Sequence, residues 1–303
     1  MGKIKYWLIA GFIILLAIVY TAISDRYSTL SRLKSAGENG DVEAQYALGL
    51  MYLYGEILDV DYQQAKIWYE KAAAQNDERA QVNLAVLYAK GNGVEQDYRQ
   101  AKSWYEKAAA QNSPDAQFAI GILYANANGV EQDYQQAKDW YEKAAEQNFA
   151  NAQFNLGMFY YKGEGVNQNF QQAREWFEKA ASQNQLNAQY NLGQIYYYGQ
   201  GVTQSYRKAK EWFEKAAGEG HVDAQYNLGV IYENGEGVGQ DFHQARAWYE
   251  KAASQNDAQA QFDLGVMNEL GQGGSINLKQ ARTWFGLACN NGHKEGCERY
   301  ENN

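Results

Sequence analysis

The chain has 303 residues, of which 36 are acidic and 27 are basic, and its formal net charge is −9. Proteins that bind nucleic acid carry basic patches. Here no basic run extends beyond Lys3 and Lys5, so the composition argues against a nucleic-acid partner. A single proline leaves nearly the whole chain free to form long helices.

Residues 1–24 form a segment distinct from the rest of the chain. Lys3 and Lys5 precede an uncharged, mainly apolar stretch from Tyr6 to Ile23, which is just long enough to span a bilayer. The small residues Ala22 and Ser24 would instead suit a signal peptidase. We expect a membrane anchor, or a signal peptide if the segment is cleaved. In both cases the positive-inside rule places the remaining chain outside the cytoplasm, on the periplasmic side or secreted.

Tryptophan recurs at a fixed interval of 36 residues through the rest of the chain. The positions are Trp68, Trp104, Trp140, Trp176, Trp212, Trp248 and Trp284. A period of this length is typical of stacked repeats that share one continuous core. We therefore expect one all-α solenoid domain over residues 25–303, with seven full hairpin repeats over residues 44–295 and a half-repeat at each end.

Each repeat is expected to fold as a hairpin of two helices. In the first helix of the first repeat, Ala44, Leu48, Met51 and Tyr52 share one helical face. Gly49 lies within this pattern and recurs in all but one of the later repeats. Glycine is unfavourable inside a helix, so its recurrence indicates that two helices approach closely there. A Gly-x-Gly-Val turn follows in most repeats.

The second helix begins at a capping residue such as Asp61, and Gln64 stands at the spacing of a capping box. Glu70 and Lys71 fall on the face that we expect to meet solvent. The opposite face should be buried, and in the first repeat it consists of Ala65, Trp68, Tyr69, Ala72 and Ala73.

The repeat closely resembles the Sel-one-like repeat (SLR), a relative of the tetratricopeptide repeats. The sixth repeat shows the pattern in full, with Ala-Gln-Tyr-Asn-Leu-Gly at 224–229, Asn-Gly-Glu-Gly-Val at 234–238 and Trp-Tyr-Glu-Lys-Ala-Ala at 248–253. The resemblance covers residues 27–300. It implies a right-handed α/α superhelix that serves as a scaffold for protein assemblies, without implying a particular partner.

Cys289 and Cys297 are the two cysteines, and seven residues separate them. The spacing resembles the Cys-x7-Cys staple of cysteine-rich secreted SLR proteins, which implies a disulfide that closes the C-terminal end of the stack. An export segment supports this interpretation, because disulfides persist in oxidising compartments. The alternative is a pair of small buried residues, because Cys289 stands where all six other repeats have an alanine.

Catalytic chemistry finds little support in the sequence. Ser31 and Ser205 each begin an S-x-x-K motif, but the Ser-Asp-Asn and Lys-Thr-Gly motifs that β-lactam-cleaving serines need are absent. His293 is the histidine nearest to the two cysteines, and a structural zinc site needs four ligands. We therefore expect no catalytic residue, no metal and no cofactor. A weak β-lactam- or peptidoglycan-interacting protein remains the alternative function, suggested by the cysteine-rich SLR relatives alone.

The predicted function is a non-enzymatic scaffold of a bacterial-type envelope that binds a protein or peptide on its concave face. A row of amide side chains on the first helices could bond to an extended partner, or could instead join neighbouring repeats. This row includes Asn83, Asn155, Asn191 and Asn227. The residues nearby vary between repeats, and their aromatic character suits an interface. They include Tyr161, Lys162, Tyr197 and Tyr198.

Overall fold

The computed structural model describes residues 28–55 and 59–302. These residues form helices and connecting turns, and no strand occurs among them. None of the described helices is long and apolar enough to cross a bilayer. The expected anchor or signal peptide at residues 1–24 lies outside the described part of the chain. Contacts divide the helices into two compact units, and the boundary falls between Ala144 and Ala145.

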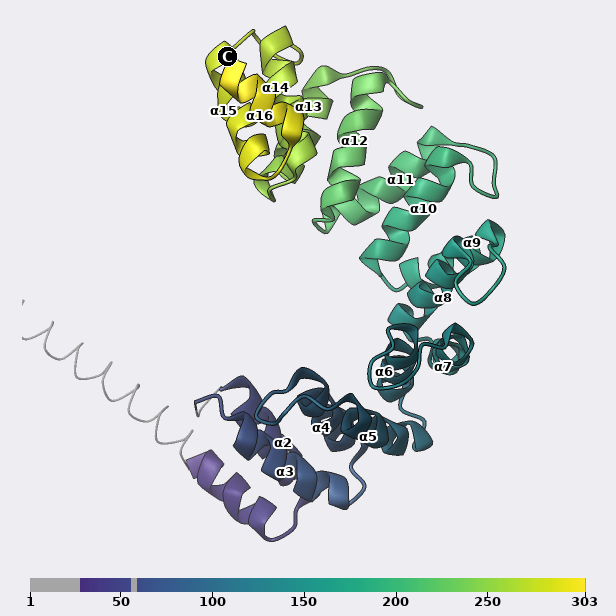
Figure 1. Cartoon of the computed structure of the whole chain (residues 1–303), viewed down its shortest axis with the longest axis vertical. Coiled ribbons are helices and arrows are strands. Elements are labelled where there is room, and N and C mark those ends of the chain that lie inside the picture. The colour runs from purple at the N-terminus through teal and green to yellow at the C-terminus, as the bar shows by residue number, and fades with distance from the viewer. Residues whose placement is uncertain (1–27, 56–58, 303) are drawn as a thin grey trace, which may run out of the picture. The chain divides into compact units, whose positions relative to one another are not determined.

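Unit 1 begins with a helix over residues 28–38, which matches the half-repeat expected before the first hairpin. Three hairpins follow, and the unit boundary lies inside the last helix (Figure 1). The helices are α2 (Val42–Tyr54), α3 (Tyr62–Ala74), α4 (Glu78–Lys90), α5 (Tyr98–Ala110), α6 (Pro114–Ala125) and α7 (Tyr134–Glu146).

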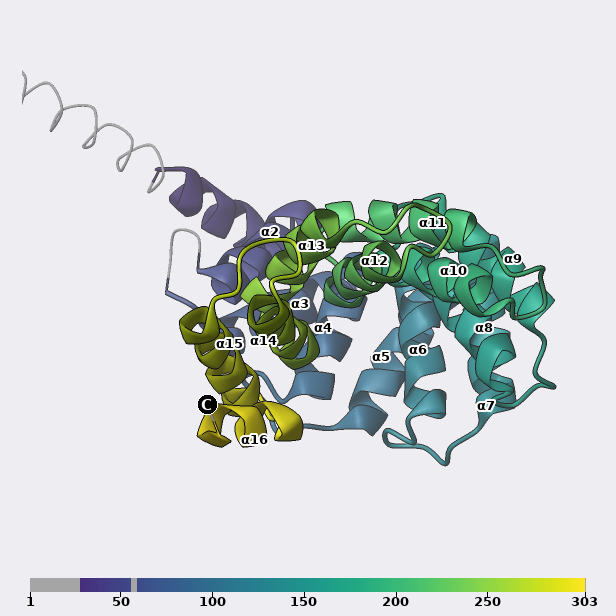
Figure 2. The ribbon, with the colours of Figure 1, turned by 90° about the horizontal axis from the view of Figure 1, so that it is seen from above.

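Unit 2 contains four hairpins and a final helix that corresponds to half a repeat. The helices are α8 (Ala150–Lys162), α9 (Phe170–Ala181), α10 (Leu186–Tyr198), α11 (Tyr206–Gly218), α12 (Val222–Asn234), α13 (Phe242–Ser254), α14 (Ala258–Leu270), α15 (Leu278–Asn290) and α16 (Lys294–Asn302). In Figure 2 the first helices α8, α10 and α12 run along one side of this unit, and the second helices α9, α11 and α13 run along the other.

The recurring glycine allows the two helices to touch in the six hairpins that have it, as the sequence predicts. At Gly229 in α12, an added Cβ would lie 2.3 Å from Cε1 of Tyr249 in α13. Real Cβ atoms do not approach so closely, so even alanine would push the helices apart. The turn glycine Gly235 ends α12 in the left-handed region, with φ 73°, which favours a residue without a Cβ.

The second helices bury most of the predicted apolar stripe, but the tryptophans are less buried than expected. Trp68 is 6 % exposed, whereas the later tryptophans are only partly buried. In six repeats the lysine three residues further on covers the indole ring. Lys215 Nζ, for example, lies 3.9 Å from the ring centroid of Trp212. The ring packs on the preceding hairpin on one side and makes a cation–π contact on the other, so it does not need full burial.

A buried glutamine stands at the same position of every first helix from α2 to α14, and the sequence analysis did not single it out. Gln225 Nε2 donates to the carbonyl oxygen of Ala217 at 3.2 Å, and Gln225 Oε1 accepts from Gln255 Nε2 at 2.9 Å. We call these residues the glutamine row. It consists of Gln45, Gln81, Gln117, Gln153, Gln189, Gln225 and Gln261, all at most 5 % exposed.

The cysteines form the disulfide that the family resemblance implies, between Cys289 of α15 and Cys297 of α16. Its place in the repeat is informative. Cys297 stands 36 residues after Gln261, and Cys289 stands 36 residues after Ala253, whose carbonyl oxygen accepts from Gln261 Nε2. The disulfide therefore takes the place of the glutamine–carbonyl hydrogen bond at this last junction.

Candidate partner-binding face of the first helices

The predicted amides of unit 2 lie on the first helices and are half-buried. Asn191 Nδ2 donates to the carbonyl oxygen of Asn187, and Asn227 Nδ2 donates to that of Asp223, each at 2.7 Å. Both bonds lie within one helix, whereas the glutamine row makes the bonds that link repeats. Asn155 occupies the same place on α8 and is also half-buried.

The predicted aromatic residues divide into packed and exposed ones. Tyr161 lies edge-on to Phe170 with ring centroids 5.4 Å apart, so it packs against the second helix of its own hairpin. Tyr197 makes the equivalent contact with Tyr206 at 5.2 Å. Tyr198 is different, because 61 % of it is exposed.

Lys162 and Asn83 stand apart from these rings. Lys162 is exposed, and its Nζ lies 3.5 Å from Oε1 of Glu164 in the following turn. Asn83 belongs to unit 1, where its side chain lies beside the hydroxyl of Tyr69. Of the eight predicted residues, seven are therefore in unit 2.

Unit 2 also brings together residues that the sequence analysis missed. Tyr190, Gln194 and Tyr198 follow one another at four-residue spacing on α10, and Gln194 Nε2 donates to the Tyr190 hydroxyl at 2.7 Å. Asn227 of α12 lies beside the same hydroxyl, and burial raises the pKa of Tyr190 to about 12. We call these four residues the α10–α12 patch. The four-residue spacing was the signal in the sequence that could have revealed it.

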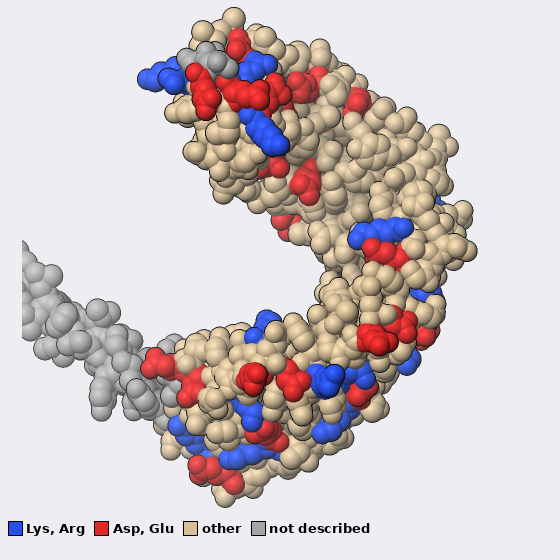
Figure 3. All heavy atoms as spheres, in the orientation of Figure 1, with Lys and Arg blue, Asp and Glu red and all other residues tan. Residues whose placement is uncertain are grey.

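The four side chains of the α10–α12 patch are uncharged, and the negative charge of Asp223 nearby adds to the rise in the pKa of Tyr190. The helix α10 contains no charged residue, and Figure 3 shows few charged side chains over α10 and α12 on the face it displays. Tyr190 is held in place from behind by His221, whose ring stacks on it with centroids 4.6 Å apart. Burial lowers the pKa of His221, which favours the neutral ring at neutral pH.

At the next junction along unit 2, acids stand in place of one amide and one tyrosine of this face. Asp263 of α14 occupies the repeat position of Asn227, and Glu233 of α12 occupies that of Tyr197. The Tyr249 hydroxyl donates to Glu233 Oε2 at 2.6 Å. Burial, aided by the negative charge of Glu233, raises the pKa of Asp263 to about 6. The first-helix face thus changes from neutral and aromatic to acidic towards the C-terminus.

The two serines that begin S-x-x-K motifs lie at a helix cap and on a helix surface. Ser205 is the N-cap of α11, and its hydroxyl accepts from the backbone nitrogen of Lys208 at 3.4 Å. Ser31 is an exposed residue of the helix at 28–38. Within residues 28–55 and 59–302, no three His, Cys, Asp or Glu side chains are grouped so that they could hold a metal ion.

Comparison with known proteins agrees with this architecture. The Sel1 repeat matches seven consecutive times, at residues 42–77, 78–113, 114–149, 150–185, 186–221, 222–257 and 258–293. No curated protein matches the chain.

Two solved structures are similar over most of the chain. A protective antigen of uropathogenic Escherichia coli strains with an SLR fold is 36% identical, with a TM-score of 0.78; the match covers 88% of this chain but only 58% of the antigen. A Sel1 repeat protein from Oxalobacter formigenes is 33% identical, with a TM-score of 0.76, over 90% of this chain and 79% of its own. The chain belongs to the Sel1 repeat family.

Proposed function

We propose that this protein is a non-enzymatic scaffold that binds a protein or peptide partner at the α10–α12 patch. Sel1 repeat proteins are generally protein-interaction scaffolds, and this is the family to which the chain belongs. The observation that carries the proposal is Tyr198, which is 61 % exposed on a helix without charge. Exposed aromatic side chains beside amides are typical of binding surfaces.

The chemistry of the patch suits an extended peptide. Gln194 and Asn227 carry amides that can both donate to and accept from a peptide backbone, while Tyr198 offers a ring for an apolar side chain. Asp263 and Glu233, at the next junction, favour a partner with a basic residue on that side. The other predicted residues extend the face towards α8. They are Asn155, Asn191, Tyr161, Lys162 and Tyr197.

We further propose that the repeats lie outside the cytoplasm of a bacterial-type envelope, tethered or released by residues 1–24. Two observations support this location: the lysines that precede the apolar stretch, and the disulfide between Cys289 and Cys297. A C-terminal fusion to an alkaline phosphatase that is active only after export should be active. A silent fusion whose protein is present at normal levels would contradict this location.

Site-specific crosslinking tests the binding face. A photoreactive amino acid at position 198 should capture a discrete partner in cells. Tyr54 provides a matched control, because it occupies the same repeat position as Tyr198, in unit 1, and is 67 % exposed. The patch is not the binding face if position 54 captures the same partner with equal yield, or if position 198 captures none.

Substitutions separate binding from stability. Asn227→Ala combined with Tyr198→Ala should reduce capture, measured with the photoreactive group moved to position 194, by about tenfold or more. Helical content and melting should change little, because Tyr198 is exposed and the Asn227 amide bonds within its own helix and lies beside the Tyr190 hydroxyl, without holding the backbone of another repeat. Trp212→Ala should instead destabilise unit 2 by about 2–4 kcal/mol, because it removes a large, partly buried aromatic side chain.

A further inference from the structure

One junction of unit 2 lacks a side-chain donor that the equivalent positions of the other repeats supply. At the repeat position of Glu219, the C-cap of α11, five repeats have glutamine and the seventh has Asn291. In the fourth repeat the single nitrogen Gln183 Nε2 donates to Gln153 Oε1 at 2.8 Å and to Asn148 Oδ1 at 3.3 Å. A carboxylate accepts hydrogen bonds and cannot donate them. The fifth repeat therefore lacks this donor.

Gln189 is left with an unpaired acceptor at this junction. It is 4 % exposed, and its Oε1 is the one side-chain oxygen of the glutamine row that is buried without a hydrogen-bond partner among the described residues. It occupies the repeat position of Gln153, whose Oε1 points towards Gln183, so Gln189 Oε1 points towards Glu219. An unpaired buried acceptor is unfavourable, so a donor that reaches it from outside is favoured.

A pocket of about 580 Å³ opens between α9 and α11 at the same point. Gln189 and Glu219 both line it. The other lining residues are Glu178, Ala181, Ser182, Asn184, Trp212 and Lys215. We call this the α9–α11 pocket. No residue of the α10–α12 patch lines it, so it is separate from the binding face proposed above.

The polar lining of the α9–α11 pocket offers hydrogen-bond acceptors. The side chains of Asn184 and Glu219 form no hydrogen bond or ion pair with the other described residues. Asn184 occupies the repeat position of Asn148, whose Oδ1 accepts from the same nitrogen as the glutamine row does. Gln189 Oε1, Asn184 Oδ1 and the Glu219 carboxylate can therefore accept from one donor group in the pocket.

The charges of the α9–α11 pocket favour a cation. Glu178 and Glu219 line it against one basic residue, Lys215, so two negative charges and one positive charge give a net charge of −1. Lys215 Nζ is already engaged, 3.9 Å from the centroid of the Trp212 ring. Glu178 Oε1 lies 3.8 Å from Arg174 Nε, so Glu219 is the carboxylate of the pocket that has no cation beside it.

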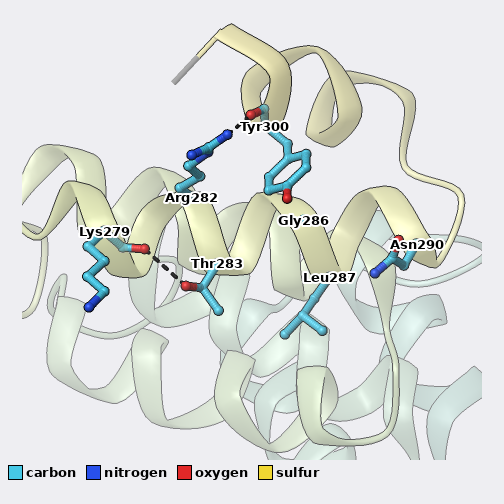
Figure 4. Close-up of a pocket in the computed structure, with 7 residues that line it drawn as sticks. All are labelled: Lys279, Arg282, Thr283, Gly286, Leu287, Asn290 and Tyr300. Atoms are coloured by element: carbon cyan, nitrogen blue, oxygen red, sulfur yellow. Dashed lines mark hydrogen bonds between the residues drawn. The ribbon is translucent and has the colours of Figure 1, made fainter.

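The pocket on α15 that Figure 4 shows has the opposite charge. Lys279 and Arg282 line that pocket, and no acidic residue is among its lining residues. At the junction of α13 with α15, Asn291 Nδ2 donates to Gln261 Oε1 at 2.9 Å, so the acceptor there is paired. A cationic ligand is therefore favoured between α9 and α11 and disfavoured on α15.

We propose that the α9–α11 pocket binds a primary alkylammonium group. At the preceding junction one nitrogen bonds to both acceptors, and an ammonium nitrogen in the same place would donate to Gln189 and Asn184. Its third hydrogen would bond to Glu219, whose charge it would balance. A guanidinium spreads its donors over a planar fork and does not fit a single point so well.

Entry of the group needs only movement of side chains. Gln189 Oε1 is shielded from solvent, but Asn184 and Glu219 beside it are exposed and can turn aside. Trp212 and Ala181 supply apolar surface for the alkyl chain. The ammonium group can belong to a free amine or to a lysine side chain of a protein, and the chemistry in the pocket is the same.

Titration of the ¹⁵N-labelled full chain with n-butylammonium chloride tests the proposal. The reporter is the indole N–H signal of Trp212, which a Trp212→Phe chain identifies. This signal should shift saturably with n-butylammonium and should not shift with n-butanol, which has the same alkyl chain without the charge. Nα-acetyl-lysine methylamide presents the group as a protein would. Binding as tight as that of n-butylammonium indicates a lysine side chain, and weaker binding indicates a free amine.

Three substitutions locate the binding. Glu219→Gln supplies the donor of the other repeats and removes the carboxylate, so it should weaken binding of n-butylammonium at least tenfold. Gln189→Leu removes the buried acceptor but keeps Glu219, and it should weaken binding at least fivefold. Glu175→Gln is the matched control: Glu175 is an exposed acidic residue of α9 that does not line the pocket, and the dissociation constant should stay the same.

Four outcomes would overturn the proposal. They are the absence of a shift with n-butylammonium, an equal shift with potassium chloride at the same concentration, unchanged binding by the Glu219→Gln or Gln189→Leu chain, and equal weakening by Glu175→Gln. The second outcome would make the pocket a site for a simple ion. Capture at position 198 does not involve the α9–α11 pocket, so the two binding proposals fail independently.

Discussion

Glu219→Gln should stabilise unit 2, because it would repair a gap in the glutamine row. In the sixth repeat Gln225 Oε1 accepts from Gln255 Nε2 at 2.9 Å. The corresponding residue in the fifth repeat is Glu219, whose carboxylate cannot donate, and Gln189 Oε1 is buried without a hydrogen-bond partner. An unsatisfied buried acceptor costs about 1–3 kcal/mol.

The expected gain from Glu219→Gln is about 1–2 kcal/mol in the free energy of unfolding. Part of any gain could come from removing a negative charge at the C-terminus of α11, where Glu219 is the C-cap. That effect is about 0.3–1 kcal/mol. Glu219→Ala removes the charge without supplying a donor, so the difference between the two variants isolates the hydrogen bond.

Urea unfolding followed by far-UV circular dichroism would measure these differences, with hydrogen exchange of α10 and α11 to localise them. A double-mutant cycle completes the test, because Gln189→Leu removes the acceptor that the new donor needs. If Glu219→Gln stabilises the Gln189→Leu chain as much as the natural one, the hydrogen-bond explanation is wrong.

Three further predictions concern unit 2. Reducing the disulfide, or Cys289→Ser, should lower the free energy of unfolding of the C-terminal end by about 2–3 kcal/mol in the chain-entropy model. Hydrogen exchange should then be faster for the amides of α16 but not for those of α10. Gly229→Ala should destabilise by at least about 1–3 kcal/mol through overpacking, whereas Gly218→Ala, in open space at the end of α11, should stabilise by up to about 1 kcal/mol in thermal unfolding. Burial raises the pKa of Asp263 to about 6, so the folded protein favours the protonated carboxyl. The stability that this gives is full below about pH 4 and is lost as the pH rises through 6, where the buried carboxyl ionises. Asp263→Asn should therefore raise the free energy of unfolding more at pH 7 than at pH 4, by up to about 3 kcal/mol.

The repeat made most of the local fold predictable from the sequence. A 36-residue period fixes where each helix begins and ends, and the recurring Gly49 correctly indicated close helix contact. The glutamine row was not predicted because a polar residue next to apolar ones in a helix is normally expected to be exposed. Its bonds cross between hairpins, and sequence spacing within one helix does not show them. The right-handed superhelix implied by the family resemblance stays a prediction.

The candidate site was predicted less well, for a related reason. The sequence analysis treated Asn191 and Asn227 as one row with uncertain partners, and the structure gives each a bond inside its own helix. Tyr161 and Tyr197 looked free because they vary between repeats, yet each packs on the second helix of its hairpin. Variation along a repeat marks positions that the stack does not require, and only the structure shows which of them solvent reaches.

The disulfide shows how an end junction differs physically from an inner one. At an inner junction a glutamine such as Gln261 donates to the preceding hairpin and accepts from Asn291 of its own, so both of its polar atoms are satisfied. A glutamine at position 297 would need a donor from a second helix after α16, and residues 28–302 contain none. Its acceptor would stay unpaired if buried. The disulfide between Cys289 and Cys297 joins the same two points and needs no hydrogen-bond partner.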